Sequence, residues 1–175
     1  MTATPPAATP PSPSPEPSAT PVPPPGADFL VLDRQICFSL HAAARAFDGL
    51  YRVLLKELGL TYPQYLVMLV LWEHGTLAVK ELGGHLRLDS GTLSPLLKRV
   101  ESAGLVRRER DARDERSVRV HLTEEGAALR EKALAVPPRI AAATEFDYEE
   151  IADLRIRLDR LTRALDQAVL TTPFE

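Results

Sequence analysis

The hydrophobic residues of this chain recur with two different spacings, and the change of spacing divides the sequence into predicted elements. A spacing of three or four residues predicts an amphipathic helix over residues 33–58. The next predicted helix, residues 62–74, is apolar on nearly every side, which is typical of a buried central helix. Thr61 can cap this helix, and Pro63 lies in its first turn, where a missing N–H costs little.

Two short helices separated by a tight turn are predicted next, over residues 79–86 and between Asp89 and Gly104. Asp89 or Ser90 is the predicted N-cap of the second helix, and Gly104 ends it. The side opposite its inward leucines carries short polar side chains followed by cations: Ser90, Thr92, Ser94, Lys98 and Arg99. Short polar side chains near a helix N-terminus can reach base edges while cations meet phosphate, so this helix is predicted to recognise DNA.

A β-hairpin follows, because apolar and polar residues alternate at 105–110 and again at 117–122. The intervening residues 111–116 are mostly charged and too many for a packed turn, so they are expected to project from the surface. Leu77-Ala78 can add a short third strand. Together these elements predict a mainly α (α+β) fold, a winged helix-turn-helix whose DNA-binding core covers about residues 76–123.

Further helices are predicted to flank this core on its C-terminal side as well. Thr123 caps a helix over residues 124 to about 136, which Pro137-Pro138 breaks. Asp147, with a glutamate three residues later, resembles a capping box for a last helix to about Leu170. The apolar stripes of the N- and C-terminal helices need a partner, and a second copy of the chain is the economical one. We therefore expect dimerisation helices and a homodimer on pseudo-palindromic double-stranded DNA.

Composition changes this picture mainly at the N-terminus. Residues 1–27 consist mostly of Pro, Ala, Ser and Thr, with Glu16 as their one charged side chain. This segment cannot bury apolar surface, so we expect a disordered tail followed by one folded domain over 28–175. The net charge of −3 does not by itself suggest a nucleic-acid partner. The segment 76–123 is nevertheless net positive, so acidic residues elsewhere would orient it towards DNA.

The single cysteine, Cys37, excludes an intramolecular disulfide and suits a reducing cytoplasm. No apolar run approaches membrane-spanning length, and the N-terminus does not have the pattern of a signal peptide. Neither a metal-ligand spacing nor a glycine-rich phosphate loop is present. We therefore expect a cytoplasmic protein with no membrane partner, no cofactor or metal, and no enzymatic activity.

The sequence resembles the MarR family of bacterial transcription regulators, and within it the organic hydroperoxide resistance (OhrR) type that has one cysteine. The resemblance covers roughly Leu32 to Pro138. It is carried by Leu32-Asp33-Arg34-Gln35-Ile36-Cys37-Phe38, Leu60-Thr61-Tyr62-Pro63-Gln64-Tyr65-Leu66, Leu71-Trp72-Glu73, residues 88–99 and Asp114-Glu115-Arg116-Ser117-Val118. Other MarR proteins share the Asp-x-Arg motif of the wing but usually lack the cysteine and the Thr-Tyr-Pro-Gln-Tyr run.

This resemblance implies a homodimeric repressor that leaves its operator when an organic hydroperoxide oxidises Cys37, and so derepresses peroxide-detoxification genes. Tyr51 and Tyr62 match the tyrosines that hydrogen-bond the sensing cysteine. Within the wing, Arg116 matches the arginine that enters the minor groove, and Asp114 matches the acid that braces it. The positions assigned to DNA binding are Ser90, Thr92, Ser94, Pro95, Lys98, Arg99, Arg113, Asp114 and Arg116.

A peroxide-sensing cysteine must react as a thiolate, which nearby donors or cations favour. His41 follows Cys37 by one helical turn, where relatives often carry a tyrosine; it either helps to hold the thiolate or is simply solvated. Tyr51 lies fourteen residues after Cys37, roughly 21 Å along a straight helix. If both serve one site, Tyr51 must come from the other subunit. Because no second cysteine exists, the sulfenic acid is expected to condense with a low-molecular-weight thiol or a backbone nitrogen, or to over-oxidise.

Two other functions compete with the redox-sensing repressor. The first is a MarR-type repressor relieved by a small aromatic ligand in a cleft at the dimer interface, with Cys37 merely structural. The second is a thiol peroxidase, for which the thiol itself is the sole support. Loss of the peroxide response in a Cys37→Ser variant would separate the first alternative from redox sensing, and multiple turnover with a thiol reductant would favour the second.

Overall fold

The computed structural model describes residues 28, 30–111 and 117–171, and it divides the chain into two compact units, residues 1–41 and 42–175. The first unit contains the short 3-10 helix η1 (Leu32–Arg34) and the start of α1 (Ile36–Leu54). In this unit the Asp28 carboxylate accepts a hydrogen bond from Leu30 N at 2.9 Å, and Arg34 Nη1 donates to Asp28 O at 3.1 Å. Most of the apolar side chains of this unit are exposed, Leu30 and Ile36 among them.

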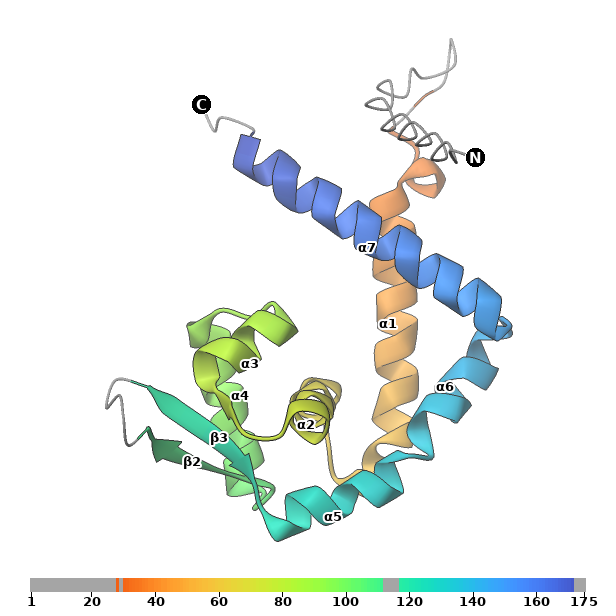
Figure 1. Cartoon of the computed structure of the whole chain (residues 1–175). Coiled ribbons are helices and arrows are strands. Elements are labelled where there is room, and N and C mark those ends of the chain that lie inside the picture. Colours follow the sequence, from red (N-terminus) through yellow and green to blue (C-terminus); the bar gives the residue numbers. More distant parts are fainter. Residues whose placement is uncertain (1–27, 29, 112–116, 172–175) are drawn as a thin grey trace, which may run out of the picture. The chain divides into compact units, whose positions relative to one another are not determined.

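The second unit contains the rest of α1 and all remaining elements in the order expected of a winged helix-turn-helix (Figure 1). These are η2 (Lys56–Leu58), α2 (Tyr62–His74), β1 (Leu77–Ala78), α3 (Val79–Leu86), α4 (Ser90–Ser102), β2 (Val106–Arg110), β3 (Val118–Leu122), α5 (Glu124–Ala133), α6 (Val136–Thr144) and α7 (Tyr148–Thr171). The three strands form an antiparallel sheet in the order β1-β3-β2. The predicted fold class, including the short strand at Leu77-Ala78, is confirmed.

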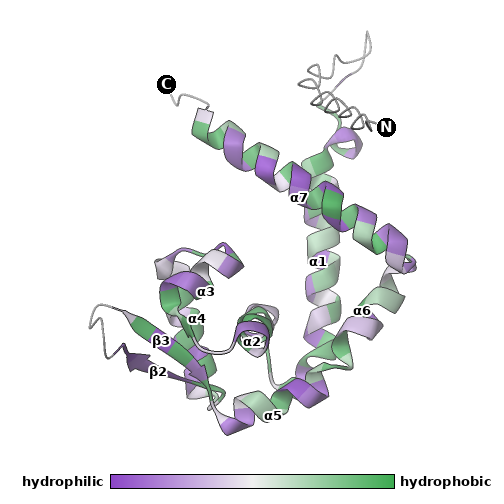
Figure 2. Cartoon of the chain, viewed as in Figure 1, coloured by the Kyte–Doolittle hydropathy of each residue, from purple (hydrophilic) through white to green (hydrophobic). Residues whose placement is uncertain are grey.

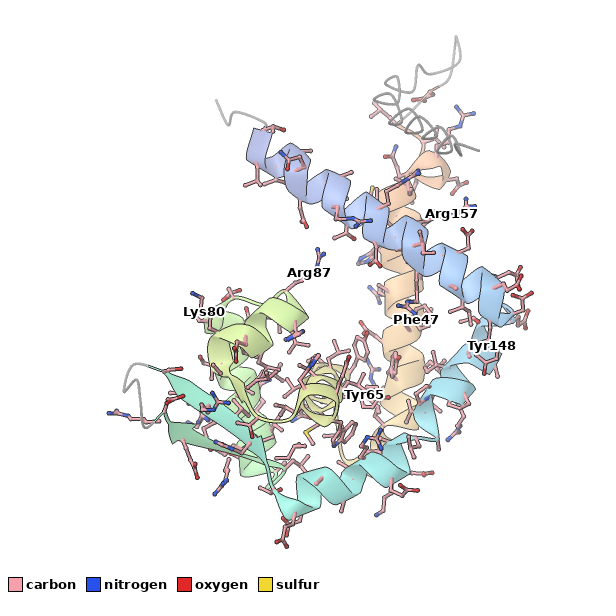
Figure 3. The ribbon with its side chains drawn as sticks, viewed as in Figure 1. Phe47, Tyr65, Lys80, Arg87, Tyr148 and Arg157 are labelled. Atoms are coloured by element: carbon pink, nitrogen blue, oxygen red, sulfur yellow. The ribbon has the colours of Figure 1, made fainter. Side chains whose placement is uncertain are left out.

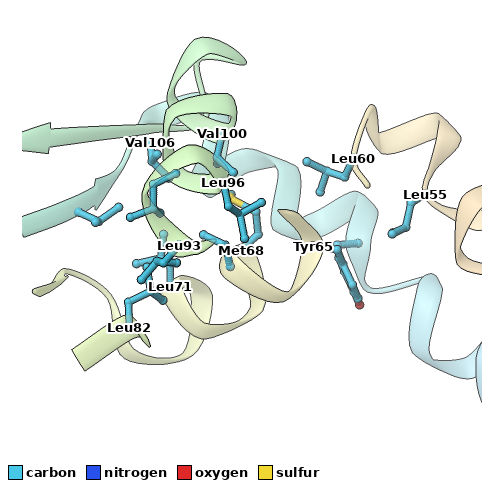
Figure 4. Packing of buried hydrophobic residues seen from close by; sticks show 14 of the residues in the cluster. Leu55, Leu60, Tyr65, Met68, Leu71, Leu82, Leu93, Leu96, Val100 and Val106 are labelled. Carbon is cyan, nitrogen blue, oxygen red and sulfur yellow. The ribbon is translucent and has the colours of Figure 1, made fainter. Parts of the chain in front are cut away.

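Helix α2 is the centre of the core, as its apolar sequence predicts. Tyr65, Val67, Met68 and Leu71 are buried, and α2 packs against α3, α4 and α5. Figure 4 shows this packing, with Leu82 of α3 and the inward leucines of α4 surrounding Met68 and Leu71. Figure 2 shows hydrophilic and hydrophobic residues interspersed along α7. The core therefore lies beneath the helix-turn-helix and holds α4 by its inward side.

The first helix differs from its prediction over residues 33–58. Gln35 has extended backbone angles and separates η1 from α1, and α1 ends at Leu54 rather than continuing to residue 58. Residues 56–58 form a separate 3-10 turn that ends at Gly59, whose φ of 65° suits a residue without a side chain. The apolar spacing was compatible with one continuous helix because such short interruptions barely change which side faces inward.

The helix after the wing also differs from its prediction. Thr123 caps α5 through its hydroxyl, which accepts from Gly126 N at 3.0 Å, but α5 ends at Ala133. The predicted break near Pro137 and Pro138 is present, but it lies at residues 134–135, and the two prolines are in the first turn of a further helix, α6, that the sequence did not predict. Proline is tolerated there because the first amides of a helix have no partner within it. The capping box that begins α7 is confirmed, since Asp147 N donates to the carboxylate of Glu150 at 2.8 Å.

No helix in the described ranges 28, 30–111 and 117–171 is long and apolar enough to cross a membrane.

Candidate functional site

Helix α4 begins at a cap made by Asp89, which decides between the two predicted cap residues. One carboxylate oxygen of Asp89 accepts from Thr92 N at 2.9 Å, and the other accepts from the Thr92 hydroxyl at 2.9 Å. These hydrogen bonds, led by that from the Thr92 amide, lower the pKa of Asp89. The Thr92 hydroxyl proton is therefore engaged within the cap, while its oxygen can still accept a hydrogen bond.

The two sides of α4 differ sharply in burial. Leu93, Leu96, Leu97 and Val100 are buried in the core. Every residue of α4 that the sequence assigned to DNA binding is exposed: Ser90, Thr92, Ser94, Pro95, Lys98 and Arg99. One side of the helix thus packs in the core. The other side presents hydroxyl groups near the start of the helix and two cations further along. This side can meet both base edges and phosphate groups.

The wing, meaning strands β2 and β3, carries a polar network on the side that bears Arg107 and Glu109. Arg107 Nη1 lies 2.8 Å from Glu109 Oε1, and His121 Nε2 lies 3.6 Å from Glu109 Oε2. Thr76 Oγ1 lies 3.0 Å from the other ring nitrogen of His121. Figure 2 shows β2 as largely hydrophilic. The predicted tip residues Arg113, Asp114 and Arg116 lie outside the described residues.

Cys37 lies in the first turn of α1 and its thiol is exposed. His41, one turn further along the same helix and in the same unit, is exposed as well. An exposed thiol is accessible to a small oxidant, which a buried structural cysteine is not. Its sequence neighbours Ile36 and Phe38 are apolar and exposed.

The predicted tyrosines Tyr51 and Tyr62 come together in the second unit. Their rings stack with centroids 4.3 Å apart, and Tyr65, which sequence reasoning did not assign to the site, lies 6.0 Å from Tyr51. Burial, followed by the neighbouring Tyr62 and Tyr65, raises the pKa of Tyr51 to about 12. Burial is also the main cause that raises the pKa of Tyr62, with Asp48 second. All three phenols therefore keep their protons near neutral pH and can act as hydrogen-bond donors.

The raised pKa of Tyr51 gives a testable dependence of stability on pH. Because the folded value of about 12 lies above the ordinary value of 10.0, the contribution is complete below pH 10 and is lost as pH rises towards 12. We expect a Tyr51→Phe variant to lose less unfolding free energy than wild type across that range, measured by urea titration. Tyr148→Phe is the control, because Tyr148 is 80% exposed; equal pH curves for wild type and Tyr51→Phe would contradict the assignment.

A pocket of about 640 Å³ lies beside the start of α4. It is bounded by α3, α4 and the wing, and residues from each line it: Val79, Lys80, Gly83, Gly84, Arg87, Leu88, Ser90, Leu93, Ser94, Leu97, Arg108, Ser117 and Val118. Figure 3 shows Arg87 reaching away from the end of α3 towards α7, where its guanidinium lies 3.0 Å from Asp166.

Among the described residues, no group of three or more His, Cys, Asp or Glu side chains could hold a metal ion.

Comparison with known proteins matches this chain to transcriptional regulators. The family model of the transcriptional regulators SarA/Rot matches residues 49–132. The organic hydroperoxide resistance transcriptional regulator of Bacillus subtilis (strain 168) is 47% identical over 140 residues, which are 80% of this chain and 95% of that protein. The HTH-type transcriptional regulator TtmR of Methylorubrum extorquens (strain PA1) is 50% identical over 136 residues, 78% of this chain and 68% of that protein. A solved structure of reduced AbfR bound to DNA has a TM-score of 0.68 and 35% identity, and covers 79% of this chain and 94% of that chain.

Proposed function

The chain belongs to the SarA/Rot and MarR-type family of winged-helix transcriptional regulators. On this premise we propose that it is a homodimeric DNA-binding repressor, and that it releases its operator when an organic hydroperoxide oxidises Cys37. The observation that carries the DNA-binding part of the proposal is the exposed side of α4. This side has hydroxyl groups and cations, whereas the leucines on the opposite side are buried in the core. Its relative AbfR has been solved on DNA.

The exposed apolar side chains of α7 support a homodimer. This helix has no buried residue, yet large apolar side chains recur along it with exposed fractions of 42–80%: Leu154, Ile156, Leu165, Val169 and Leu170. Leu154, Leu165 and Val169 share one side of the helix, and a second copy of the chain would cover that side and remove it from water. The two-fold axis of the dimer would then present two copies of α4 to the two halves of a pseudo-palindromic operator.

The exposed thiol of Cys37 supports the sensing part. Its thiolate attacks one oxygen of the hydroperoxide O–O bond, so that sulfur gains that oxygen as a sulfenic acid and the peroxide leaves as its alcohol after taking up a proton. We propose that His41 favours the thiolate, and that Tyr51 and Tyr62 of the partner protomer donate hydrogen bonds at the sulfur. The B. subtilis relative is named for organic hydroperoxide resistance.

Exchange of Cys37 for serine tests this function directly. We expect wild type to lose its operator affinity after treatment with cumene hydroperoxide, whereas the Cys37→Ser variant stays bound, because a hydroxyl cannot form the sulfenic acid. The measurement is fluorescence anisotropy on the DNA upstream of the gene, with both proteins and both conditions. Equal release of both proteins would reject Cys37 as the sensor, and an absence of DNA binding by untreated wild type would reject the function as a whole.

The fate of the sulfenic acid is a separate part of the proposal. With one cysteine per chain, we propose condensation with a low-molecular-weight thiol, which forms a mixed disulfide and releases water. Intact mass after peroxide and a cellular thiol would show the added thiol, and a covalent protein dimer would contradict this route. We propose no catalytic turnover for Cys37.

A repressor relieved by a small aromatic ligand is the second candidate, and the pocket beside α4 is the observation that favours it. Its apolar lining residues and the cation Lys80 suit an aromatic carboxylate. Release of the Cys37→Ser variant from DNA by an aromatic acid such as salicylate, without peroxide, would favour this candidate.

A further inference from the structure

Arg108 is a cation on the inner side of the wing. Along β2, Arg107 and Glu109 point to one side, and Arg108 points to the other with the buried Val106. Its partner across the sheet is Val120, which is fully buried. The Arg108 side chain is 30% exposed, the least of the wing arginines for which an ion pair is seen in the described residues. A purely structural wing would be expected to place an apolar residue here.

Glu101, in the last turn of α4, binds this arginine with both carboxylate oxygens. Its Oε2 accepts from Arg108 Nε at 2.9 Å and from Nη2 at 2.7 Å. Its Oε1 accepts from the backbone amide of Arg108 at 2.9 Å. Three hydrogen bonds thus join one carboxylate to the side chain and the main chain of one wing residue, which fixes orientation as well as distance.

These hydrogen bonds add a second attachment to the short turn that joins α4 to β2. The turn itself is closed by backbone hydrogen bonds from Gly104 N to Glu101 O at 2.9 Å and from Leu105 N to Val100 O at 3.2 Å. Gly104 has a φ of 75°, so the chain reverses at a residue without a side chain. A strand that is attached to a helix through one turn can still rotate about that turn. The Glu101 carboxylate binds β2 at a second point, beyond the turn, and thereby restricts the rotation of β2 relative to α4.

Folding stability alone does not account for the Glu101–Arg108 pair. Partly buried ion pairs lose hydration when they form, and apolar residues of similar size often give equal or greater stability in their place. What an apolar pair lacks is direction, because packing between methyl groups does not fix an angle between a helix and a strand. Arg108 also lines the pocket that Ser90 and Ser94 line, and its pair with Glu101 joins α4 to the wing, the two elements proposed to meet DNA.

We propose that Glu101 and Arg108 are positioning residues that fix the angle of the wing relative to α4, so that the wing meets the DNA flanking the bases read by α4 in a single register. This inference rests on the proposed DNA-binding function. It assigns no base or phosphate contact to either residue. It predicts that removing the pair affects the wing and α4 differently. The wing would no longer protect the flanking DNA, whereas α4 would still protect the DNA segment opposite it.

The test replaces both residues at once, Glu101→Leu with Arg108→Met, so that no unpaired charge is left inside the wing. The DNA probe is the duplex that wild type enriches from a pool of random sequences. Hydroxyl-radical footprinting and anisotropy are measured on that duplex, and thermal unfolding is measured on the protein alone. Glu109→Gln is the matched control, because it breaks the exposed Arg107–Glu109 pair on the opposite side of the same strand.

We expect the double variant to melt no lower than wild type, to bind the duplex roughly tenfold more weakly, and to lose protection outside the segment opposite α4. Glu109→Gln should keep the whole footprint without loss of affinity. A full footprint with wild-type affinity in the double variant would overturn the inference while the proposed function stands. Failure of wild type to enrich any duplex would overturn both.

A second variant decides the case if the double variant does not fold. Arg108→Lys keeps the charge and the apolar stem but cannot form the two-pronged contact with one carboxylate. We expect it to fold and to lose the same flanking protection, with affinity between those of wild type and the double variant. A footprint identical to that of wild type would overturn the inference.

Discussion

Replacing Gly126 with alanine is expected to destabilise the folded protein by about 3 kcal/mol, because the added methyl group would overlap backbone that cannot move away. A Cβ on Gly126 would overlap the carbonyl oxygen of Leu105 and lie 2.9 Å from its carbonyl carbon. Gly126 is held from two further directions. Its amide donates to Thr123 Oγ1 at 3.0 Å, and its carbonyl accepts from Trp72 Nε1 at 2.8 Å.

Urea titration followed by circular dichroism measures this effect, and Gly84→Ala is the matched control. Gly84 lies within α3, where a Cβ would meet nothing inside 4 Å. Alanine there should stabilise the helix by roughly 0.5–1 kcal/mol. A loss of unfolding free energy in Gly126→Ala together with a gain in Gly84→Ala would support the close packing of α5 on the start of the wing. A loss of less than about 1 kcal/mol for Gly126→Ala would contradict it.

The Gly126 contact also explains how the wing is held at its base. Leu105 is the last residue of the turn that leads from α4 into β2, and its carbonyl accepts from Thr123 N at 3.1 Å. Gly126 packs on this carbonyl from α5, and Trp72 reaches the same place from α2. Three elements therefore meet where the wing leaves the core. The Glu101–Arg108 pair then orients the strand beyond this base.

Local signals in the sequence predicted the boundaries of α2, α4 and α7 closely, because caps and apolar spacing act over only a few residues. The Asp89 cap, the end at Gly104 and the capping box before α7 are examples. The family resemblance is confirmed by relatives that are 47% and 50% identical. Pro137 predicted the break after α5 but not the start of α6, since proline can both break a helix and begin one.

Interactions between distant residues could not be predicted from the same local signals. The hydrogen bond from Trp72 to Gly126 joins residues 54 positions apart. Strand alternation places Arg108 on the same side as Val106, but its contact with Glu101 depends on how β2 packs against α4. Tyr65 had a signal that was overlooked, because it follows Tyr62 by three residues and so shares its helix side. The assignments of Cys37, His41 and the DNA-facing residues stay predictions.

Neutralising Lys98 or Arg99 is expected to weaken operator binding by about tenfold at low salt, and by more when both are replaced with alanine. Both side chains are exposed on α4 next to the buried Leu97 and Val100. Their removal should therefore leave the unfolding free energy within about 0.5 kcal/mol of wild type. The proposed homodimer would carry each residue twice, so either single variant would remove two of the proposed phosphate contacts.

The dependence of affinity on salt distinguishes this role from a general loss of charge. Each phosphate contact contributes about 0.9 to the slope of log affinity against log salt, so Lys98→Ala should flatten that slope by roughly 1.8. Lys132→Ala is the control, because Lys132 is also exposed but lies on α5. An unchanged slope for Lys98→Ala, or equal slopes for Lys98→Ala and Lys132→Ala, would mean that DNA meets another surface. A flattened slope for Lys98→Ala alone would place phosphate against the exposed side of α4, since mobile counterions respond to local phosphate neutralisation rather than to net charge.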